Sequence, residues 1–163
     1  MAAGNDDGEL VCGRFTAQST QGAFMQFVTE ITIDSSPERI WSILTDLASW
    51  QSWNTTIAGV DGAIALGNKI KVEVTANPGK AFPVKVTEFS APNQLVFAGG
   101  MPLGLFKGVR TFTLTAHGSS TDFRMSEVYS GPMAGMITKS IPDLQPSFDE
   151  FARCLKQRAE QPA

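Results

Sequence analysis

Apolar and polar residues alternate along most of the chain between residues 22 and 129, which is typical of strands with one buried face. Gly, Pro, Asn and Ser between the alternating segments mark turns. Successive strands are expected at residues 22–33, 57–60, 70–75, 82–87, 94–98, 106–116 and 121–129. The pattern therefore predicts an antiparallel sheet.

The last two strands are expected to form a tight hairpin around which the other elements are arranged. FKGVRTFTLTA and TDFRMSEVY both alternate, and the segment between them contains a Gly suited to a turn. With residues 118 and 119 as the loop, the facing pairs are Leu114 with Phe123, Phe112 with Met125 and Arg110 with Glu127. Arg110 and Glu127 would thus form an opposite-charge pair on an apolar, inward-facing surface. A slip of one residue would change these partners, so the pairing is a hypothesis.

Two short helices are expected directly after the first strand. Ser36 is a good N-cap and Pro37 fits the first helical position. The apolar residues that follow, as far as Leu47, recur at helical spacing. Ser49 is expected to cap a second short turn that ends at Trp53.

The C-terminal part of the chain predicts one long helical region. Apolar residues recur at helical spacing over residues 133–155. Pro142 and Pro146 interrupt this run, so we expect the helix to be bent or broken between them. Residues 147–157 should be its most secure part, with Phe148, Phe151 and Leu155 packed inward.

These elements predict an α+β fold. A strongly curved antiparallel sheet of about six to seven strands would bury its concave face against the long C-terminal helix. Residues 1–20 are small, polar and rich in Gly, and we expect them to form a loose N-terminal tail. Residues 21–163 would form a single domain.

Composition and charge narrow the class of protein. The 163 residues are 42% hydrophobic, which is enough for one sizeable core. A net charge of −3 provides no basic field to attract nucleic acid or an anionic membrane. The sequence has no apolar run of about 18 residues for a membrane span, and no signal-peptide pattern is expected. Cys12 and Cys154 fit neither a disulfide framework nor a metal site, so we expect a cytoplasmic protein with free thiols.

Three segments carry a resemblance to a known superfamily. They are ITIDSSPERIWSILTDLASWQSWN at residues 31–54, VKVTEFSAPNQLVF at 84–97 and RTFTLTAHGSSTDFRMSEVYSGPMAG at 110–135. Trp50 and Trp53 match a Trp-x-x-Trp-like segment, and Glu127, Tyr129 and Gly131 match a Glu-aromatic-Gly strand ending. Over residues 22–160 the chain resembles the START-related SRPBCC superfamily, whose branches include pollen-allergen-like and polyketide cyclase/dehydrase proteins.

The resemblance implies a helix-grip fold with a deep, mostly apolar cavity between the sheet and the long helix. It does not select a function, because the superfamily includes carriers, cyclases and regulatory receptors. Pro142 and Pro146 depart from the uninterrupted helix of the family, which leaves the size of the cavity opening undetermined. The segment GGMPLGL at residues 99–105 is either a flexible connection or an opening over the cavity.

Arg110 and Glu127 are the main candidates for function, and two interpretations stay open. They form a structural pair that neutralises itself across two strands, or they direct hydrogen-bonding groups toward a ligand's carbonyl or carboxylate. A neutral Glu127 could also act as a general acid in dry surroundings, and Tyr129 on the same face could supply a phenol. Glu127 and Tyr129 are therefore the candidate catalytic residues.

The remaining candidate ligand contacts are apolar. The full predicted ligand-binding set is Arg110, Glu127, Tyr129, Phe112, Met125, Trp53, Phe97 and Met136. Ordinary core packing is the competing interpretation for the tryptophans and methionines. We expect no metal site and no cofactor, because the one His, His117, lies at a predicted turn and no phosphate-binding Gly motif occurs.

Three functions follow from these observations. The first is a binding module for a lipid-like or aromatic small molecule, acting as a monomer or homodimer. The second is a cyclase or dehydratase that uses Glu127 or Tyr129 to move a proton. The third is a protein-interaction module, which would have a filled interior. A salt-bridged Glu127 and the lack of an interior His favour the binding module over the enzyme.

Overall fold

The computed structural model describes residues 23–162, and the expected tail at residues 1–20 lies outside this range. The strands are β1 (Ala23–Ile33), β2 (Ile57–Asp61), β3 (Lys69–Val74), β4 (Ala81–Ser90), β5 (Gln94–Gly100), β6 (Lys107–His117) and β7 (Ser120–Ser130). The α-helices are α1 (Pro37–Thr45), α2 (Trp50–Trp53), α3 (Ala134–Ile137) and α4 (Gln145–Glu160). Three short 3-10 turns are η1 (Leu47–Ser49), η2 (Pro102–Gly104) and η3 (Thr138–Ser140).

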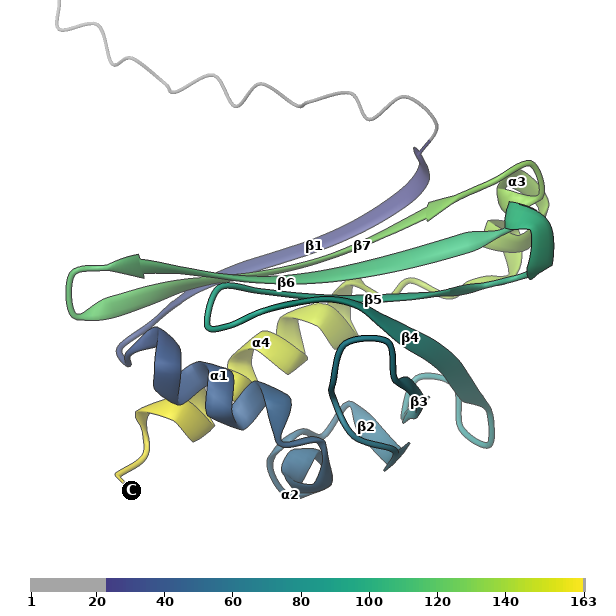
Figure 1. The fold of residues 1–163 in the computed structure, drawn as a ribbon. Helices are drawn as coiled ribbons and strands as arrows, with labels where there is room; N and C mark the ends of the chain where they lie inside the picture. The colour runs from purple at the N-terminus through teal and green to yellow at the C-terminus, as the bar shows by residue number, and fades with distance from the viewer. Residues whose placement is uncertain (1–22, 163) are drawn as a thin grey trace, which may run out of the picture.

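The strands form one antiparallel sheet in the order β1-β7-β6-β5-β4-β3-β2. Helices α1 and α4 lie on the same side of this sheet, which curls so that β2 and β3 approach the helices (Figure 1). Irregular pairing near Val86 and Glu88, where β4 meets β5, is one place where such a sheet bends. The chain thus has the α+β, helix-grip arrangement that the sequence predicts.

The central hairpin has the predicted register. His117 pairs with Ser120, so residues 118 and 119 form the two-residue loop. Gly118 has a φ of +63°, a conformation that Gly adopts without steric cost. Arg110 pairs with Glu127, as the sequence predicts. The two residues therefore project from adjacent strands onto the same face of the sheet.

Helix α1 begins as predicted, whereas the prediction that Ser49 caps α2 is wrong. The Ser36 Oγ accepts a hydrogen bond from the Arg39 backbone N–H at 3.3 Å, and Pro37 starts the helix. Ser49 does not cap α2, because it already has helical backbone angles at the end of η1. Its hydroxyl instead donates to the Asp46 carbonyl at 2.9 Å.

The C-terminal helical region is broken, as predicted. Helix α3 and η3 end before Pro142, which lies in an irregular link, and α4 begins at Gln145. Pro146 does not interrupt the helix; it lies in the first turn of α4, where its missing N–H costs no hydrogen bond. None of the helices in residues 23–162 combines the length and apolar character needed to cross a bilayer.

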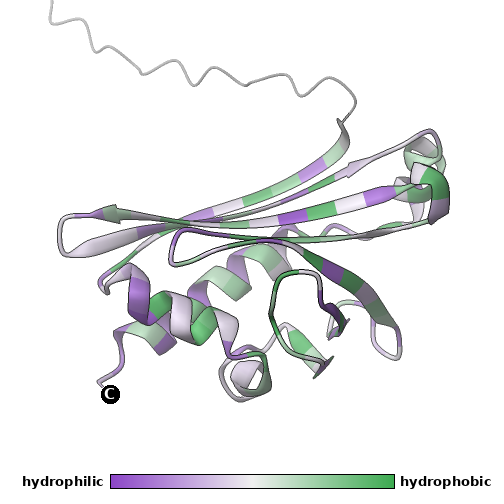
Figure 2. Ribbon diagram, viewed as in Figure 1, coloured by the Kyte–Doolittle hydropathy of each residue, from purple (hydrophilic) through white to green (hydrophobic). Residues whose placement is uncertain are grey.

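A cluster of aromatic side chains fills the space between α4 and one half of the sheet. We call Phe112, Phe123, Phe148 and Phe151 the aromatic cluster. Phe148, Phe151 and Leu155 are buried, as predicted for the inner face of α4. The Phe151 ring lies 5.8 Å from Phe112 and 6.4 Å from Phe123, centroid to centroid. Hydrophobic residues alternate with hydrophilic ones along β6 and around α4 (Figure 2). This cluster fixes α4 against the sheet and leaves the other half of the concave face for a pocket.

Candidate functional site

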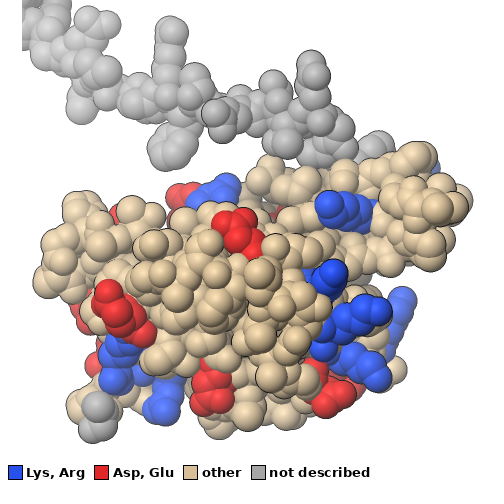
Figure 3. Space-filling model, in the orientation of Figure 1, with Lys and Arg blue, Asp and Glu red and all other residues tan. Residues whose placement is uncertain are grey.

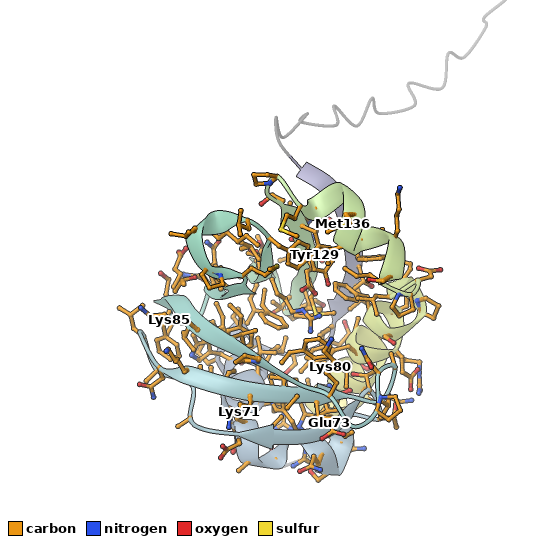
Figure 4. The ribbon with its side chains drawn as sticks, turned by 90° about the vertical axis from the view of Figure 1, so that its right-hand side faces the viewer. Lys71, Glu73, Lys80, Lys85, Tyr129 and Met136 are labelled. Atoms are coloured by element: carbon orange, nitrogen blue, oxygen red, sulfur yellow. The ribbon has the colours of Figure 1, made fainter. Side chains whose placement is uncertain are left out.

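A pocket of about 490 Å³ lies between the inner face of the sheet and the segment that joins β7 to α4. The sheet contributes apolar side chains from β4 and β5, and the segment after β7 contributes apolar side chains opposite them. The main apolar residues on these two walls are Phe82, Val84, Phe97, Ile137, Ile141 and Leu144. The polar residues are Asn77, Lys80, Arg110, Glu127, Tyr129 and Ser140. Figure 4 looks onto this end of the molecule, with Lys80 and Tyr129 on different parts of the wall.

Two facing glycines line the pocket on the inner surface of the sheet. Gly99 of β5 pairs with Gly108 of β6, and both line the pocket. In the next residue pair on the same face of the sheet, Phe97 of β5 pairs with Arg110 of β6. Side chains alternate between the two faces of a strand, so these four positions share the inner face. At the glycine pair the two strands carry no side chains of their own, and neighbouring groups approach closely: a Cβ atom at Gly99 would lie 3.1 Å from Val84 Cγ1.

Gly108 also gives the Tyr129 ring its position. A Cβ atom at Gly108 would lie 3.1 Å from Cε1 and 3.3 Å from Cδ1 of Tyr129. The ring therefore extends over the neighbouring strand at a place where any larger residue would displace it. On its other side it stacks on Phe106, with ring centroids 5.6 Å apart and planes at 13°. Gly108 and Phe106 together hold Tyr129 on the pocket wall.

Arg110 and Glu127 form an ion pair in this wall. The Arg110 Nε donates to Glu127 Oε2 at 2.9 Å, and Nη2 donates to the same oxygen. The side chains are 21% and 13% exposed, so they lie in neither bulk water nor a sealed core. The Arg110 guanidinium also lies 4.9 Å from the centroid of the Phe148 ring. A carboxylate and an aromatic face thus fix the guanidinium beside the pocket.

The Tyr129 phenol is neutral over a wide pH range. Burial raises the pKa of Tyr129 above its ordinary value, the Glu127 carboxylate raises it further, and Arg110 partly opposes this. Burial disfavours the charged phenolate, and the adjacent negative charge does the same. Tyr129 can therefore exchange hydrogen bonds with a ligand but is poorly suited to act as a base.

Arg110 also borders a second, smaller hollow of about 40 Å³. Its lining includes Thr56, Met125 and Ser147, so polar and apolar groups are mixed there. The buried Asn54 lies two residues before Thr56 in the sequence. Its Oδ1 accepts hydrogen bonds from the backbone N–H and the hydroxyl group of Thr56, while its Nδ2 has no partner among the described residues. A space of this size with several polar groups is suited to water rather than to an organic ligand.

Four of the eight predicted ligand-binding residues lie in the wall of the main pocket. They are Arg110, Glu127, Tyr129 and Phe97. Met125 lines only the smaller hollow. The structure therefore brings the polar candidates together with one aromatic candidate, and their contact with a ligand stays a prediction.

The other three candidates do not line either hollow. Phe112 is buried in the aromatic cluster, one pair further along the sheet than Arg110. Trp53 packs edge-on against Phe151, and its indole N–H donates to Ser49 Oγ at 3.3 Å. Met136 is 61% exposed on the surface of α3. Helical or strand spacing identified the face of each residue, but the distance from the pocket depends on where the elements cross.

Several wall residues were not predicted. Trp50, which the sequence suggested as packing, lines the pocket, and its indole N–H donates to the Leu44 carbonyl at 3.1 Å. Ile137 and Ile141 reach the pocket because the chain breaks before α4. The signal for the pocket's position was present in the sequence as Gly99 and Gly108, since both fall at inward-facing positions of apolar strands.

The chemical groups of the pocket are hydrogen-bonding groups, the Arg110–Glu127 charge pair and the Lys80 ammonium group. In the part of the chain that the structure describes, no cluster of three His, Cys, Asp or Glu residues could hold a metal ion. His117 is exposed at the hairpin turn, where its Nδ1 lies 3.4 Å from Asp122 Oδ2. Cys154 is a buried free thiol on α4 outside the pocket lining, and Cys12 lies outside the described residues. Orientation of a ligand is the chemistry that these groups support best.

Solved structures with the same fold come from several bacteria. A hypothetical protein of Helicobacter pylori has a TM-score of 0.68 at 13% identity, over 83% of this chain and 88% of its own. A START superfamily protein of Mycobacterium smegmatis has a TM-score of 0.61 at 20% identity, over 83% and 97%. The Aha1 dimer of Colwellia psychrerythraea has a TM-score of 0.64 at 22% identity, over 84% and 97%. At these identities the likeness concerns the fold.

A comparison of the sequence with family models identifies the family of the chain. No curated protein matches the chain significantly. A family model described as polyketide cyclase/dehydrase and lipid transport matches residues 25–160, which covers every described strand and helix from Met25 onward. The chain therefore belongs to the polyketide cyclase/dehydrase and lipid transport family, and its fold is START-like.

Proposed function

We propose that the pocket binds one amphipathic organic molecule, with an apolar body and at least one hydrogen-bond acceptor. The main support is a single ion pair, Arg110 with Glu127, set in a wall that is otherwise mostly apolar. Ligand pockets typically combine an apolar lining with a few polar groups that fix orientation. The family description, which includes lipid transport, is consistent with such a ligand.

The size of the pocket supports a small molecule rather than a peptide segment. Its volume of about 490 Å³ lies within the usual range for ligand pockets. The Phe97 ring and the stacked Phe106 and Tyr129 rings line one part of it. We therefore expect a lipid-like chain or an aromatic, polyketide-like ring system as the apolar body.

Arg110 supplies the hydrogen-bond donors for the polar end of the ligand. A guanidinium has five N–H donors, and Glu127 engages two of those of Arg110. Among residues 23–162, no other acceptor is hydrogen-bonded to this guanidinium, so donors remain for a ligand carbonyl or carboxylate. Tyr129, held beside Glu127, can add a hydroxyl contact.

A cyclase or dehydratase is the second candidate function. The observation that favours it is the neutral phenol of Tyr129 next to the Glu127 carboxylate inside the pocket. A phenol in this position could donate a proton to a leaving hydroxyl or carbonyl oxygen. Binding is preferred because Glu127 is paired with Arg110 rather than free to accept a proton. A protein-interaction module with a filled interior fits a pocket of this size poorly.

Native mass spectrometry of the purified protein tests the binding proposal. We expect a fraction of the protein to carry one small molecule that is released on denaturation. Ile141→Trp should abolish this extra mass, because Ile141 lines the pocket and an indole would occupy its space. Leu66→Trp is the matched control, since Leu66 is exposed outside the pocket and the same bulk there should leave the bound mass unchanged.

The outcomes separate the candidate functions. A released compound that stays unchanged on prolonged incubation with the protein supports binding. Its conversion to a dehydrated or cyclised product, with the loss of conversion in Tyr129→Phe, would favour the enzyme. The absence of any bound species from both the wild type and Ile141→Trp would contradict the proposed ligand.

A further inference from the structure

Four exposed apolar side chains gather at the end of the molecule beside the pocket opening. They are Met101, Leu103, Leu105 and Met136, which are 41%, 97%, 37% and 61% exposed. We call this group the apolar tip. The Met133 N–H donates to the Leu105 carbonyl at 2.9 Å, which joins the η2 loop to the start of α3. Figure 2 shows strongly hydrophobic residues in the η2 loop at this end.

Leu103 has an unfavourable backbone conformation without compensating contacts. Its φ is +60°, and it is the one non-Gly residue with a positive φ in the described part of the chain. This conformation is costly for a residue with a Cβ atom. The cost is usually offset by packing, yet the Leu103 side chain is almost fully exposed. Such an outlier points to a role outside the folded chain.

The apolar tip borders the opening of the pocket. Met101 lines the pocket itself, as does Ile137, the neighbour of Met136 in α3. Figure 4 shows Met136 and Tyr129 at the same end of the molecule. A surface that covered the apolar tip would therefore lie next to the route by which a ligand enters.

Basic residues gather on the β3–β4 side of the pocket opening even though the whole chain is acidic. Residues 69–107 contain five lysines and two glutamates, a formal charge of +3, in a chain of net charge −3. Lys71, Lys80 and Lys85 lie on the side seen in Figure 4, with Glu73 as the labelled acidic residue. Figure 3 shows Lys and Arg side chains grouped below the uncharged right-hand end. The net charge predicted no basic field, but the fold produces a local one.

Lys107, which is one of these five lysines, and Lys139 flank the apolar tip directly. Lys107 is the first residue of β6, opposite Gly100 at the base of the η2 loop. Lys139 lies in η3, three residues after Met136. Both lysines are exposed. Residues 98–109 and 129–142, which carry the apolar tip, contain these two lysines and no Asp or Glu.

We propose that the open end of the pocket docks on an anionic lipid membrane, with the apolar tip inserted between headgroups and the lysines facing lipid phosphates. Aliphatic side chains bordered by lysines are the composition of an interfacial membrane site. Protein interfaces also favour Met, together with Trp, Tyr, Phe and Arg, but they are depleted in Lys, which flanks the apolar tip here. Docking would bring the pocket opening to the lipid surface. The proposal concerns the surface alone and holds whether or not a ligand is bound.

Flotation with lipid vesicles tests this docking. The full-length protein should bind vesicles that contain one part phosphatidylserine to two parts phosphatidylcholine. It should bind vesicles of phosphatidylcholine alone more weakly, by about fivefold for each lysine that contacts the surface. Raised salt should remove the difference between the two vesicles, because salt screens exposed charges.

Substitutions separate the apolar and basic contributions. Leu103→Asn should weaken binding to both kinds of vesicle without harming the fold, because Asn tolerates a positive φ. Leu66→Asn is the matched control at an exposed Leu away from the apolar tip, and it should bind as the wild type does. Lys107→Glu combined with Lys139→Glu should reduce binding only to the anionic vesicles. Lys107→Glu alone has its matched charge control in Arg158→Glu, near the C-terminal end of α4, which should bind anionic vesicles as the wild type does.

Two results would overturn the proposal. One is equal flotation of the wild type and Leu103→Asn with anionic vesicles. The other is self-association in sedimentation velocity that Leu103→Asn abolishes, with no vesicle binding, which would make the apolar tip an interface between two copies of the chain. Failure of vesicle binding would leave the proposed ligand site intact, because native mass spectrometry tests that site without lipid vesicles.

Discussion

At the scale of single residues, the space left by Gly108 determines how Tyr129 lies on the pocket wall. We predict that Gly108→Ala weakens ligand binding at least about tenfold and destabilises the protein by about 1–2 kcal/mol. The added Cβ would lie 3.1 Å from the Tyr129 ring, which must then move into the pocket or away from Glu127. Urea denaturation and titration with an amphipathic probe measure the two effects.

Gly59→Ala is the control for this substitution. Gly59 also lies in a strand, but a Cβ there would meet only Glu73 atoms at 3.6 Å, an ordinary contact distance. We expect this variant to be neutral or slightly more stable, because Ala restricts the unfolded chain more than Gly does. Similar losses of stability in Gly59→Ala and Gly108→Ala would show that the tight contact with Tyr129 is not the cause.

Tyr129 makes the stability of the protein depend on pH in the alkaline range. Its pKa is raised in the folded state above the ordinary value of 10.0, so the folded chain holds this proton more tightly than the unfolded chain. Stability should therefore be unaffected by this group below pH 10 and fall as the pH rises above it. Tyr129 is the one tyrosine of the chain, so tyrosinate absorbance reports its titration directly.

The expected titration midpoint lies above 10 in the folded protein and returns to the ordinary value in urea. Tyr129→Phe should lose the part of the alkaline destabilisation that belongs to this group, while the contribution of the lysines remains. A folded-state midpoint at the ordinary value would mean that the phenol is in contact with water rather than buried beside Glu127.

At the scale of elements, the pair Arg110–Glu127 links β6 to β7 at the boundary between the aromatic cluster and the pocket. We predict that Arg110→Met alone destabilises the protein by about 2–3 kcal/mol, since it leaves a mostly buried carboxylate without its partner. The cost is below that of a fully buried pair, because the side chains keep some exposure. Combining it with Glu127→Leu should restore much of the loss.

Urea denaturation of the two single variants and the double variant measures this coupling. The double variant should be folded but unable to orient the polar end of a ligand, which separates stability from binding. Additive costs of the two substitutions would contradict a coupled pair and favour two independent surface charges.

Some elements of the fold could be predicted from the sequence, and others could not. The hairpin was predictable because two alternating strands and a Gly turn fix the pairing of Arg110 with Glu127. The false cap at Ser49 arose because η1 and α2 continue directly into each other, so no free helix start exists there. Pro146 could not be distinguished from Pro142 by helical spacing, because its effect depends on where α4 begins.

At the scale of the whole molecule, the curl of the sheet decides which inward residues reach the pocket. Strand periodicity placed Phe97 and Phe112 on the inner face, but only Phe97 lies on the pocket wall. The difference depends on where α4 crosses the sheet and fills it with Phe151, which no local pattern encodes. Met136 is exposed because it lies on the outer face of α3, whose Ala134 is buried and whose Ile137 lines the pocket.

A titration with anilinonaphthalene sulfonate, an aromatic probe that carries one anionic group, tests directly whether the pocket binds a ligand. We predict one saturable site in the wild type and in Leu66→Trp, and affinity at least about tenfold lower in Ile141→Trp, whose new side chain would fill the pocket. Far-UV circular dichroism confirms that each variant is folded. Equal affinity in all three proteins, or no saturable site in the wild type, would contradict a ligand-binding pocket between the sheet and the C-terminal helical region.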